Sequence, residues 1–225
     1  MFDIDNIMLS YLGYDLSYLE FWVTLMNLWS VIAFRRNSIW AYPTSIVACT
    51  GLAIMFYQIN LYSDQLLNVY YVAISIVGWM WWLQKTPGGA EKYPITTISA
   101  EGRVAVLALI VFGTLILGGN IDAIFSSLAE IVAFILGTTY THIPAQMPYW
   151  DAFTTVASMV AMYMLTKRYV ESWVLWALVN IVCIALYWYR GVYFLSLEYV
   201  VFLVNSIYAY IQWKTISDDT SNLYK

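Results

Sequence analysis

Hydrophobic stretches that contain no charged residue recur along the whole chain. They cover residues 21–34, 37–63, 65–84, 104–121, 152–166, 172–189 and 199–213. A helix needs about 20 mostly apolar residues to cross a bilayer, and a shorter run suffices where its charged ends reach the headgroups. Continuous apolar runs indicate helices, because the strands of a membrane barrel show short alternating patterns. The pattern predicts an all-α integral membrane protein that crosses the bilayer several times.

Turn signals and charged ends divide these runs into seven predicted transmembrane helices. The turn-rich loop TPGGAEKYP, at 86–94, separates the third helix from the fourth. The predicted helices lie at about 17–34, 39–57, 63–83, 103–119, 150–166, 172–189 and 195–213. They form a first three-helix unit, a linker that contains the fourth helix, a second three-helix unit and a polar cytoplasmic tail, at 17–84, 85–148, 149–214 and 215–225.

The stretch 121–137 is apolar enough for an eighth span but carries Asp122 and Glu130. Basic residues collect on the cytoplasmic side of membrane proteins, so their distribution separates the two topologies. With seven spans, nine basic residues lie on one side and Arg190 on the other, whereas an eighth span would leave six against four. We therefore expect seven spans, the N-terminus outside and the C-terminus in the cytoplasm. Residues 121–137 then form an amphipathic helix at the outer surface, or a partly re-entrant one. The nine are Arg35, Arg36, Lys85, Lys92, Arg103, Lys167, Arg168, Lys214 and Lys225.

A shift of 131 residues along the chain, without a gap, aligns the first three-helix unit with the second. Sequence identity is barely above chance, and the weight comes from boundary charges and segment lengths that fall into step. This repeat shift pairs Glu20 with Asp151, Arg36 with Lys167, Tyr42 with Trp173, Ser75 with Ser206 and Trp82 with Trp213. Each unit has an odd number of spans, and one further span lies between them, so both units point the same way. This predicts a 3+1+3 parallel-repeat transporter with its binding site near the bilayer midplane.

Composition agrees with the membrane class and argues against catalysis. With 62% hydrophobic and 11% charged residues, the chain lies outside the soluble range. The acidic N-terminus lacks the basic region of a signal peptide. Cys49 and Cys183 read as small core residues, and His142 as the single histidine does not form a metal site. No nucleophile–histidine pair, HExxH or P-loop motif is present, so we expect no enzyme, no metal, no cofactor and no nucleic-acid partner.

Polar and aromatic side chains form stripes on the predicted helices of the two units. Residues spaced three or four apart share one helix face, and lipid disfavours a polar face. The stripes are Trp173, Trp176, Asn180 and Tyr187; Gln65, Asn68, Ser75 and Trp79; and Glu198, Asn205 and Gln212 with Tyr208 beside them. Hydrogen bonding between helices is the alternative role for such polar groups, and an interfacial belt for the Trp pair.

The spans contain no Lys or Arg, which restricts the ligand. A phosphate or carboxylate site would normally present a fixed cation or a broken helix N-terminus. Aromatic rings and amides suit an uncharged or cationic ring compound, through stacking, cation–π contacts and hydrogen bonds.

Several motifs resemble the PnuC family of vitamin B3 transporters. They are SYLEF at 17–21, NLYSDQLLNVYY at 60–71, MPYWDAFTT at 147–155, and ESWVLWALVN…LYWYRGVY at 171–193. The resemblance implies a full-length relative of the SWEET and semiSWEET transporters in a bacterial inner membrane, often as a homotrimer. It also implies facilitated diffusion of nicotinamide riboside for NAD biosynthesis, with trapping by a cytosolic kinase.

The residues and the resemblance together suggest a set of substrate contacts. We expect Trp173 and Trp176 to face the pyridinium ring, and further groups to bind the amide and hydroxyls. The polar candidates are Gln65, Asn68, Asn180 and Asn205, with Tyr71 and Tyr208 as further ones. A transporter of the same fold for a sugar or another vitamin such as thiamine, and a non-transporting receptor or scaffold, stay open. Ion coupling through Glu198 or Asp151 also stays open.

Overall fold

The structure is a computed structural model that describes residues 6–11, 14–58, 62–137, 139, 146–191 and 193–223. Its described part contains seven helices, preceded by a short antiparallel hairpin. The helices are α1 Tyr18–Arg35, α2 Ala41–Gln58, α3 Tyr62–Trp82, α4 Ala100–Leu136, α5 Pro148–Thr166, α6 Ser172–Tyr189 and α7 Tyr193–Leu223. The hairpin strands are β1 Ile7–Tyr11 and β2 Tyr14–Ser17, and they are the one departure from the predicted all-α class.

Local sequence explains why the helices begin and end close to their predicted bounds. The hydroxyl of Ser17 accepts a hydrogen bond from the backbone N–H of Glu20 at 3.0 Å, which forms the N-cap of α1. Pro148 occupies the first turn of α5, where a missing N–H costs nothing. Two helices are longer than predicted: α4 continues past Gly119 to Leu136, and α7 continues past Trp213 to Leu223 and so includes most of the predicted tail.

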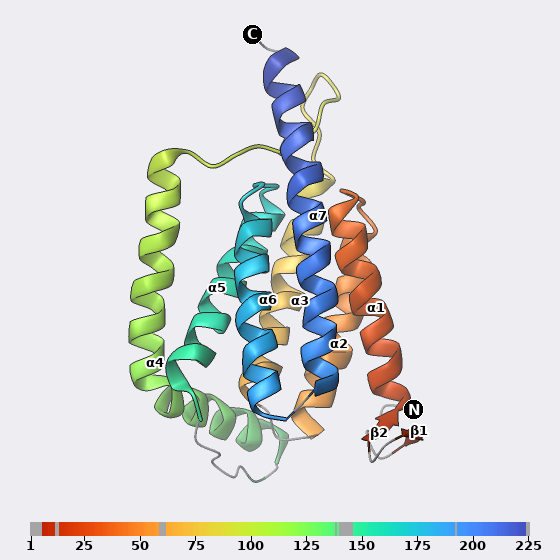
Figure 1. Ribbon diagram of the computed structural model, residues 1–225, viewed down its shortest axis with the longest axis vertical. Helices are drawn as coiled ribbons and strands as arrows, with labels where there is room; N and C mark the ends of the chain where they lie inside the picture. Colours follow the sequence, from red (N-terminus) through yellow and green to blue (C-terminus); the bar gives the residue numbers. More distant parts are fainter. Residues whose placement is uncertain are drawn as a thin grey trace.

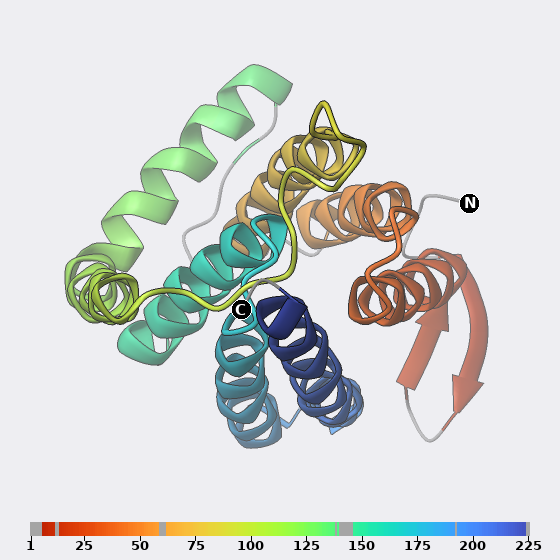
Figure 2. The ribbon, with the colours of Figure 1, turned by 90° about the horizontal axis from the view of Figure 1, so that it is seen from above.

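Six helices form a closed ring in the order α1, α2, α3, α5, α6 and α7, with α7 packing back on α1. Figure 2 shows this ring from above, with α4 outside it against α5. Helices α1 and α5 run through the ring in the same direction (Figure 1). The buried amide and hydroxyl residues of the polar stripes, Asn68, Ser75, Asn180 and Asn205, lie on α3, α6 and α7 of this ring, whereas Trp79 and Gln212 are exposed.

Helix α4 is one continuous element of 37 residues. At about 1.5 Å per residue it is roughly 55 Å long, which exceeds the roughly 30 Å apolar core of a bilayer. Figures 1 and 2 show that it bends, so that its second half turns away from the first and runs outside the ring beside α5, toward α3. Gly118 and Gly119 lie mid-helix, and a glycine pair permits such a kink. Residues 121–137 thus continue the fourth helix instead of forming a separate one; their place at the membrane surface stays a prediction.

The α1–α2 and α5–α6 turns have the same geometry at positions that the repeat shift pairs. Asn37 has φ 52° and its equivalent, Arg168, has φ 57°, both left-handed conformations that are rare outside glycine. The backbone N–H of each donates to the residue three before it, Phe34 or Leu165, at 2.9 Å in both turns. The shift that aligned the sequences therefore aligns these turns residue by residue.

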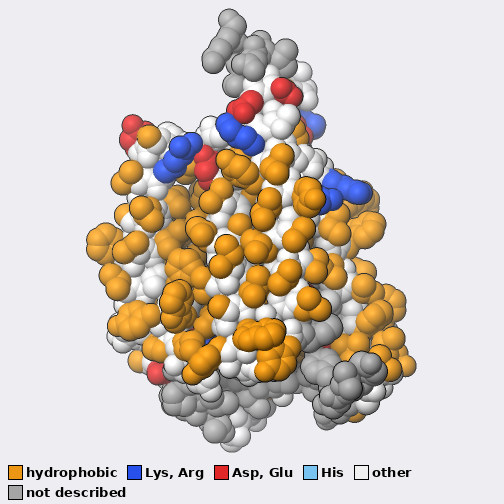
Figure 3. Space-filling model, viewed as in Figure 1, with side chains coloured by type: hydrophobic (Ala, Val, Ile, Leu, Met, Phe, Trp, Pro, Cys, Tyr) orange, Lys and Arg blue, Asp and Glu red, His pale blue; other side chains and the backbone are white. Residues whose placement is uncertain are grey.

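Charge and hydrophobicity divide the surface into zones. Figure 3 shows a broad hydrophobic band, with the Lys and Arg side chains gathered toward the end from which the C-terminus projects. We call this the basic end; it carries the α1–α2, α3–α4 and α5–α6 connections (Figure 1). Three helical stretches are long and apolar enough to cross a membrane by length and composition, namely Ala100–Ile135, Ser172–Tyr189 and Leu195–Asp219. In the other four helices, α1, α2, α3 and α5, many Tyr, Trp and polar residues lower the mean hydropathy.

Candidate functional site

An aromatic cluster closes the ring interior at the basic end, and its two halves match under the repeat shift. Tyr42 lies edge-on to Trp82 with ring centroids 4.9 Å apart and planes at 87°. Their equivalents, Trp173 and Trp213, lie 5.5 Å apart, also at 87°. Trp82 and Trp213 contact each other at 6.3 Å. The repeated spacing therefore corresponds to a repeated packing unit.

Two indole N–H groups tie the halves of the ring together reciprocally. Trp82 donates to the backbone carbonyl of Thr166 at 3.1 Å, at the end of α5. Trp213 donates to the carbonyl of Arg35 at 2.9 Å, at the end of α1. The repeat shift pairs the two donors and also the two acceptors, so each half binds the same position of the other. Helix ends leave free carbonyls, which these indoles satisfy.

Trp176, Tyr71 and Asn180 lie in the middle of the ring. The rings of Trp176 and Tyr71 lie 6.3 Å apart, which joins α6 to α3. Asn180 is 3% exposed and donates to the Ser206 hydroxyl at 3.1 Å, which joins α6 to α7. These contacts place three of the predicted site residues on adjoining faces of the interior.

Gln65, Trp173 and Asn205 have buried polar atoms without a protein partner among the described residues. These atoms are the Gln65 Oε1, the Trp173 Nε1 and the Asn205 Oδ1. The amide nitrogen of Asn205 donates weakly to the Val31 carbonyl at 3.4 Å, so its oxygen is the free acceptor. A buried polar atom without a hydrogen bond costs about 1–3 kcal/mol. Tyr42, Ser172 and residues outside the ring interior also have such atoms, so the three atoms alone do not define a site. Gln65 and Asn205 present free acceptors inside the ring that a polar ligand can satisfy.

Of two further predicted site residues, Asn68 is buried and Tyr208 is exposed. The amide of Asn68 donates to the Asp64 carbonyl of its own helix at 2.9 Å, so its oxygen points away from that bond. Tyr208 is 60% exposed on the outer surface of α7. Three residues correspond to about 300° around a helix, so Tyr208 points about 60° away from Asn205. The inward face of α7 is narrower than that, so Asn205 is buried and Tyr208 is not. Tyr208 does not line the interior.

The predicted substrate contacts included no residue of α2, and so they missed Tyr42. Tyr42 is fully buried, and its hydroxyl has no partner among the described residues. One turn further on, Ser45 shares a 3.2 Å hydrogen bond with Ser75 of α3. The sequence signal was present, because the repeat shift pairs Tyr42 with Trp173. Helix α2 therefore supplies a wall of the interior, as α6 does.

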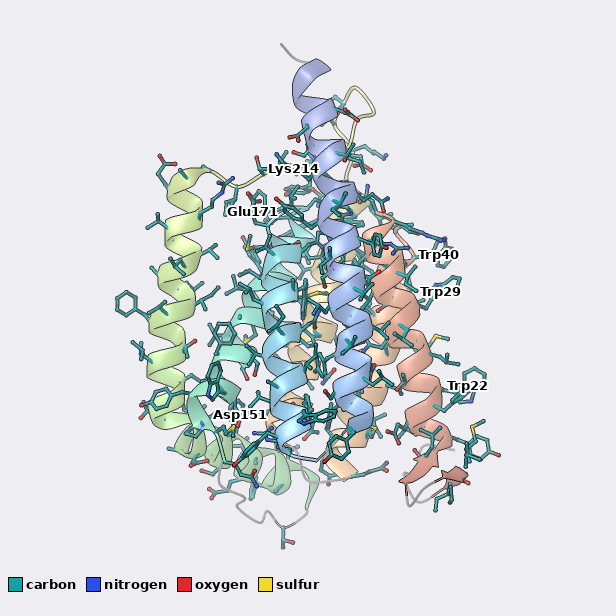
Figure 4. The ribbon with its side chains drawn as sticks, viewed as in Figure 1. Trp22, Trp29, Trp40, Asp151, Glu171 and Lys214 are labelled. Atoms are coloured by element: carbon teal, nitrogen blue, oxygen red, sulfur yellow. The ribbon has the colours of Figure 1, made fainter. Side chains whose placement is uncertain are left out.

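An ion pair lies at the end of the ring opposite the basic end. Both carboxylate oxygens of Asp151 accept hydrogen bonds from the guanidinium of Arg190, each at 2.8 Å. Figure 4 shows Asp151 at this level, at the start of α5. Nearby, the rings of Tyr187 and Tyr199 stack at 5.3 Å. The contacts hold α5, α6 and α7 together within one half and leave Asp151 ion-paired.

The α3–α4 connection is fastened to the α5–α6 turn through Arg168. Its guanidinium, 3% exposed, pairs with Glu91, donates to the Tyr93 carbonyl and stacks on the Trp82 ring at 4.1 Å. Burial lowers the pKa of Arg168 from its ordinary value, and the charge of Glu91 opposes that shift. The linker thus stiffens the basic end.

Comparison with known proteins identifies the family. Residues 17–215 match the family described as "Nicotinamide mononucleotide transporter". The chain is similar to the nicotinamide riboside transporter PnuC of Escherichia coli (strain K12), with 30% identity over 195 residues, 84% of this chain and 82% of that protein. It is also similar to the riboflavin/roseoflavin transporter RibM of Streptomyces davaonensis, with 26% identity over 172 residues, 76% of this chain and 72% of that protein.

A solved structure shares the fold. It is the crystal structure of the vitamin B3 transporter PnuC, with a TM-score of 0.66 and 24% identity, covering 90% of this chain and 83% of that one. The family match spans α1 to the last third of α7 and so includes both halves of the ring. The resemblance read from the motifs is confirmed: the chain belongs to the nicotinamide mononucleotide transporter family.

Proposed function

We propose that this protein takes up nicotinamide riboside across the membrane through a site inside the six-helix ring. The observation that carries the proposal is the set of buried, unpartnered polar atoms on Gln65, Trp173 and Asn205. They come from α3, α6 and α7 at three levels of the ring: Gln65 near the start of α3, Asn205 midway along α7, and Trp173 in the aromatic cluster at the basic end. The Trp176–Tyr71 contact joins α6 to α3 between these levels. The name of the Escherichia coli relative supplies the substrate class.

The chemistry of the interior suits this ligand. Nicotinamide riboside has a cationic aromatic ring, a carboxamide and ribose hydroxyls. An indole such as Trp176 attracts a cationic ring by cation–π contact, and amide oxygens such as the Asn205 Oδ1 accept from hydroxyl and carboxamide N–H groups. Among the described residues of the ring helices, Lys and Arg occur only toward the basic end, at Arg35 and Lys214, so a phosphorylated product would find no cation midway along the ring.

The proposed mechanism is rocking of residues 17–84 against 149–214 in a 3+1+3 parallel-repeat arrangement. The equivalent turns at Asn37 and Arg168, and the reciprocal indole bonds of Trp82 and Trp213, support two like halves. Those indole bonds join the halves at the basic end, so access from that side requires them to break. We propose that the structure represents a form closed at the basic end.

We further propose that the basic end faces the cytoplasm of a bacterial inner membrane, with the N-terminus outside. The collection of Lys and Arg at that end supports this orientation. Transport is facilitated diffusion, followed by trapping when a cytosolic kinase phosphorylates the riboside. Assembly as a homotrimer belongs to the same proposal and follows from the family resemblance.

Riboflavin is the second candidate substrate, because the chain also resembles a riboflavin/roseoflavin transporter. Riboflavin is an uncharged, three-ring compound with a flexible ribityl chain. A site that depends on cation–π contact with Trp176 would favour the smaller cationic ligand.

Competition binding on the purified protein tests the assignment. Each of five unlabelled compounds is tested for its ability to displace labelled nicotinamide riboside. They are the riboside itself, riboflavin, thiamine, glucose and nicotinamide mononucleotide. The proposal expects displacement by the riboside alone at low concentration. Preferential displacement by riboflavin or thiamine would reassign the substrate, and absence of saturable riboside binding would refute the proposed function.

A further inference from the structure

A pocket of about 240 Å³ lies at the basic end, apart from the ring interior. Helix α4 contributes Arg103, the start of α6 contributes Glu171 and Val174, and α7 contributes Tyr210 and Lys214. Figure 4 shows Lys214 and Glu171 close together at this level, beside the connection that leads into α4. With the basic end at the cytoplasmic membrane surface, as proposed above, the pocket lies at the depth of the lipid headgroups.

Each of the two cations at the pocket is paired with one carboxylate, and both pairs leave N–H donors free. Glu171 is fully engaged: one oxygen accepts from Arg103 at 3.0 Å, and the other accepts from the backbone N–H of Ile98 at 3.1 Å. Arg103 is 60% exposed and uses one of its five N–H donors in that bond. Lys214 pairs with Asp218 at 2.7 Å, and such an exposed i,i+4 pair is weak. Both cations can therefore turn toward an anion.

An apolar strip continues from the pocket along the surface of the helices. On α6, Val174, Leu178 and Ile181 follow i, i+4, i+7 spacing and are 41%, 47% and 52% exposed. On α7, Ile207 and Tyr210 lie on the same face as Lys214 and are also exposed. Two cations above a strip of apolar side chains match the chemistry of a phospholipid, in which a charged phosphate is joined to acyl chains.

We propose that this pocket binds the phosphate of an anionic phospholipid, with one acyl chain along the Val174–Leu178–Ile181 strip. Arg103 supplies planar N–H donors to the phosphate, and Lys214 supplies a second charge. Arg103 pairs with Glu171, and Glu171 also accepts from the backbone N–H of Ile98 in the linker. A lipid that draws Arg103 away from Glu171 therefore acts on the contact that fastens the linker to α6. The proposal does not depend on the transported substrate.

The test compares lipid binding by the delipidated full chain and its variants in neutral detergent. Phosphatidylglycerol and phosphatidylcholine are titrated and retained lipid is measured by native mass spectrometry. Each of Arg103→Gln and Lys214→Gln is expected to weaken phosphatidylglycerol binding about fivefold, the effect of one basic charge near an anionic surface. The matched control is Arg36→Gln, an exposed cation in the α1–α2 turn, which should change binding by less than about twofold.

Three outcomes would overturn the proposal. One is equal binding of phosphatidylcholine and phosphatidylglycerol. Another is an equal loss in the Arg36 control, which would indicate unspecific attraction to the basic end. The third is full displacement of the lipid by soluble inorganic phosphate, which would identify free phosphate as the occupant. Unchanged unfolding temperatures of the variants in phosphatidylcholine establish that the proteins are folded.

Discussion

Buried polar atoms without protein partners distinguish the candidate site from ordinary contacts between membrane helices. Ser45 and Ser75 satisfy each other across α2 and α3, and Asn180 is satisfied by Ser206. Such pairs hold helices together. Gln65 and Asn205 instead keep a free acceptor inside the ring, which lowers stability unless a ligand donates to it.

Replacing Gln65 by Met should separate binding from stability. The change keeps the side-chain length and removes the unpartnered Oε1, so riboside affinity should fall about tenfold, the worth of a buried hydrogen bond. The unfolding temperature should stay the same or rise, because a buried acceptor without a partner disappears. Calorimetric binding and thermal unfolding give the two values, and Gln84→Met, in the α3–α4 connection, is the control. A large loss of stability with unchanged affinity would make Gln65 structural.

Tyr208→Ala should leave riboside binding within about twofold of the parent, the usual size of a surface effect. The reason is its exposure on the outer face of α7. Saturation binding measures the change beside Trp176→Ala, which should weaken binding because it removes the ring that we propose faces the ligand. A strong effect of Tyr208→Ala would return this residue to the site and require a different rotation of α7.

Helices α2 and α3 approach each other closely where Tyr42 packs on Gly78. A Cβ on Gly78 would overlap the Cε1 of Tyr42, and Phe34 and Trp82 hold that ring on its other sides. The absence of a side chain at residue 78 is thus what lets Tyr42 stand fully buried.

Gly78→Ala should destabilise the protein by about 1–3 kcal/mol, the usual cost of overpacking a well-packed core. Chemical unfolding in detergent measures the free energy. Gly88→Ala is the control, because a Cβ there meets no atom within 4 Å. If both variants unfold alike, the contact between Tyr42 and Gly78 is looser than described.

Helix positions followed from the sequence because apolar run length and boundary charges report directly on membrane spans. The repeat shift also led to the equivalent turns at Asn37 and Arg168, because gap-free spacing reflects backbone geometry even where side chains diverge. The single bent helix α4 was not predicted, because the sequence pattern ends the fourth span at Gly119 and indicates a separate amphipathic helix at 121–137. Tyr208 was misplaced because periodicity gives a stripe but not its width.

At the scale of the whole molecule, the two halves hold each other through equivalent bonds. The indoles of Trp82 and Trp213 donate to carbonyls that the repeat shift also pairs, those of Thr166 and Arg35. A transporter whose halves rock must break such bonds and make others of similar strength, so bonds of moderate strength at helix ends suit this role.

Trp82→Phe and Trp213→Phe should therefore have similar effects. Each removes one indole N–H and leaves one carbonyl unpaired, so each should lower the free energy of unfolding by roughly 1–3 kcal/mol. Their double variant should deviate from additivity, because the two rings contact each other at 6.3 Å. Chemical unfolding of the three variants measures this. A loss confined to one of the single variants would contradict the equivalence of the halves.

The most direct test of the central claim is uptake of labelled nicotinamide riboside into liposomes that contain this protein alone, without an ion or voltage gradient. We predict saturable uptake that stops when the inner and outer concentrations are equal, and that is greatly reduced in Gln65→Met and Asn205→Leu. Uptake no faster than in protein-free liposomes, or uptake that appears only with an imposed gradient, would contradict facilitated diffusion through the ring.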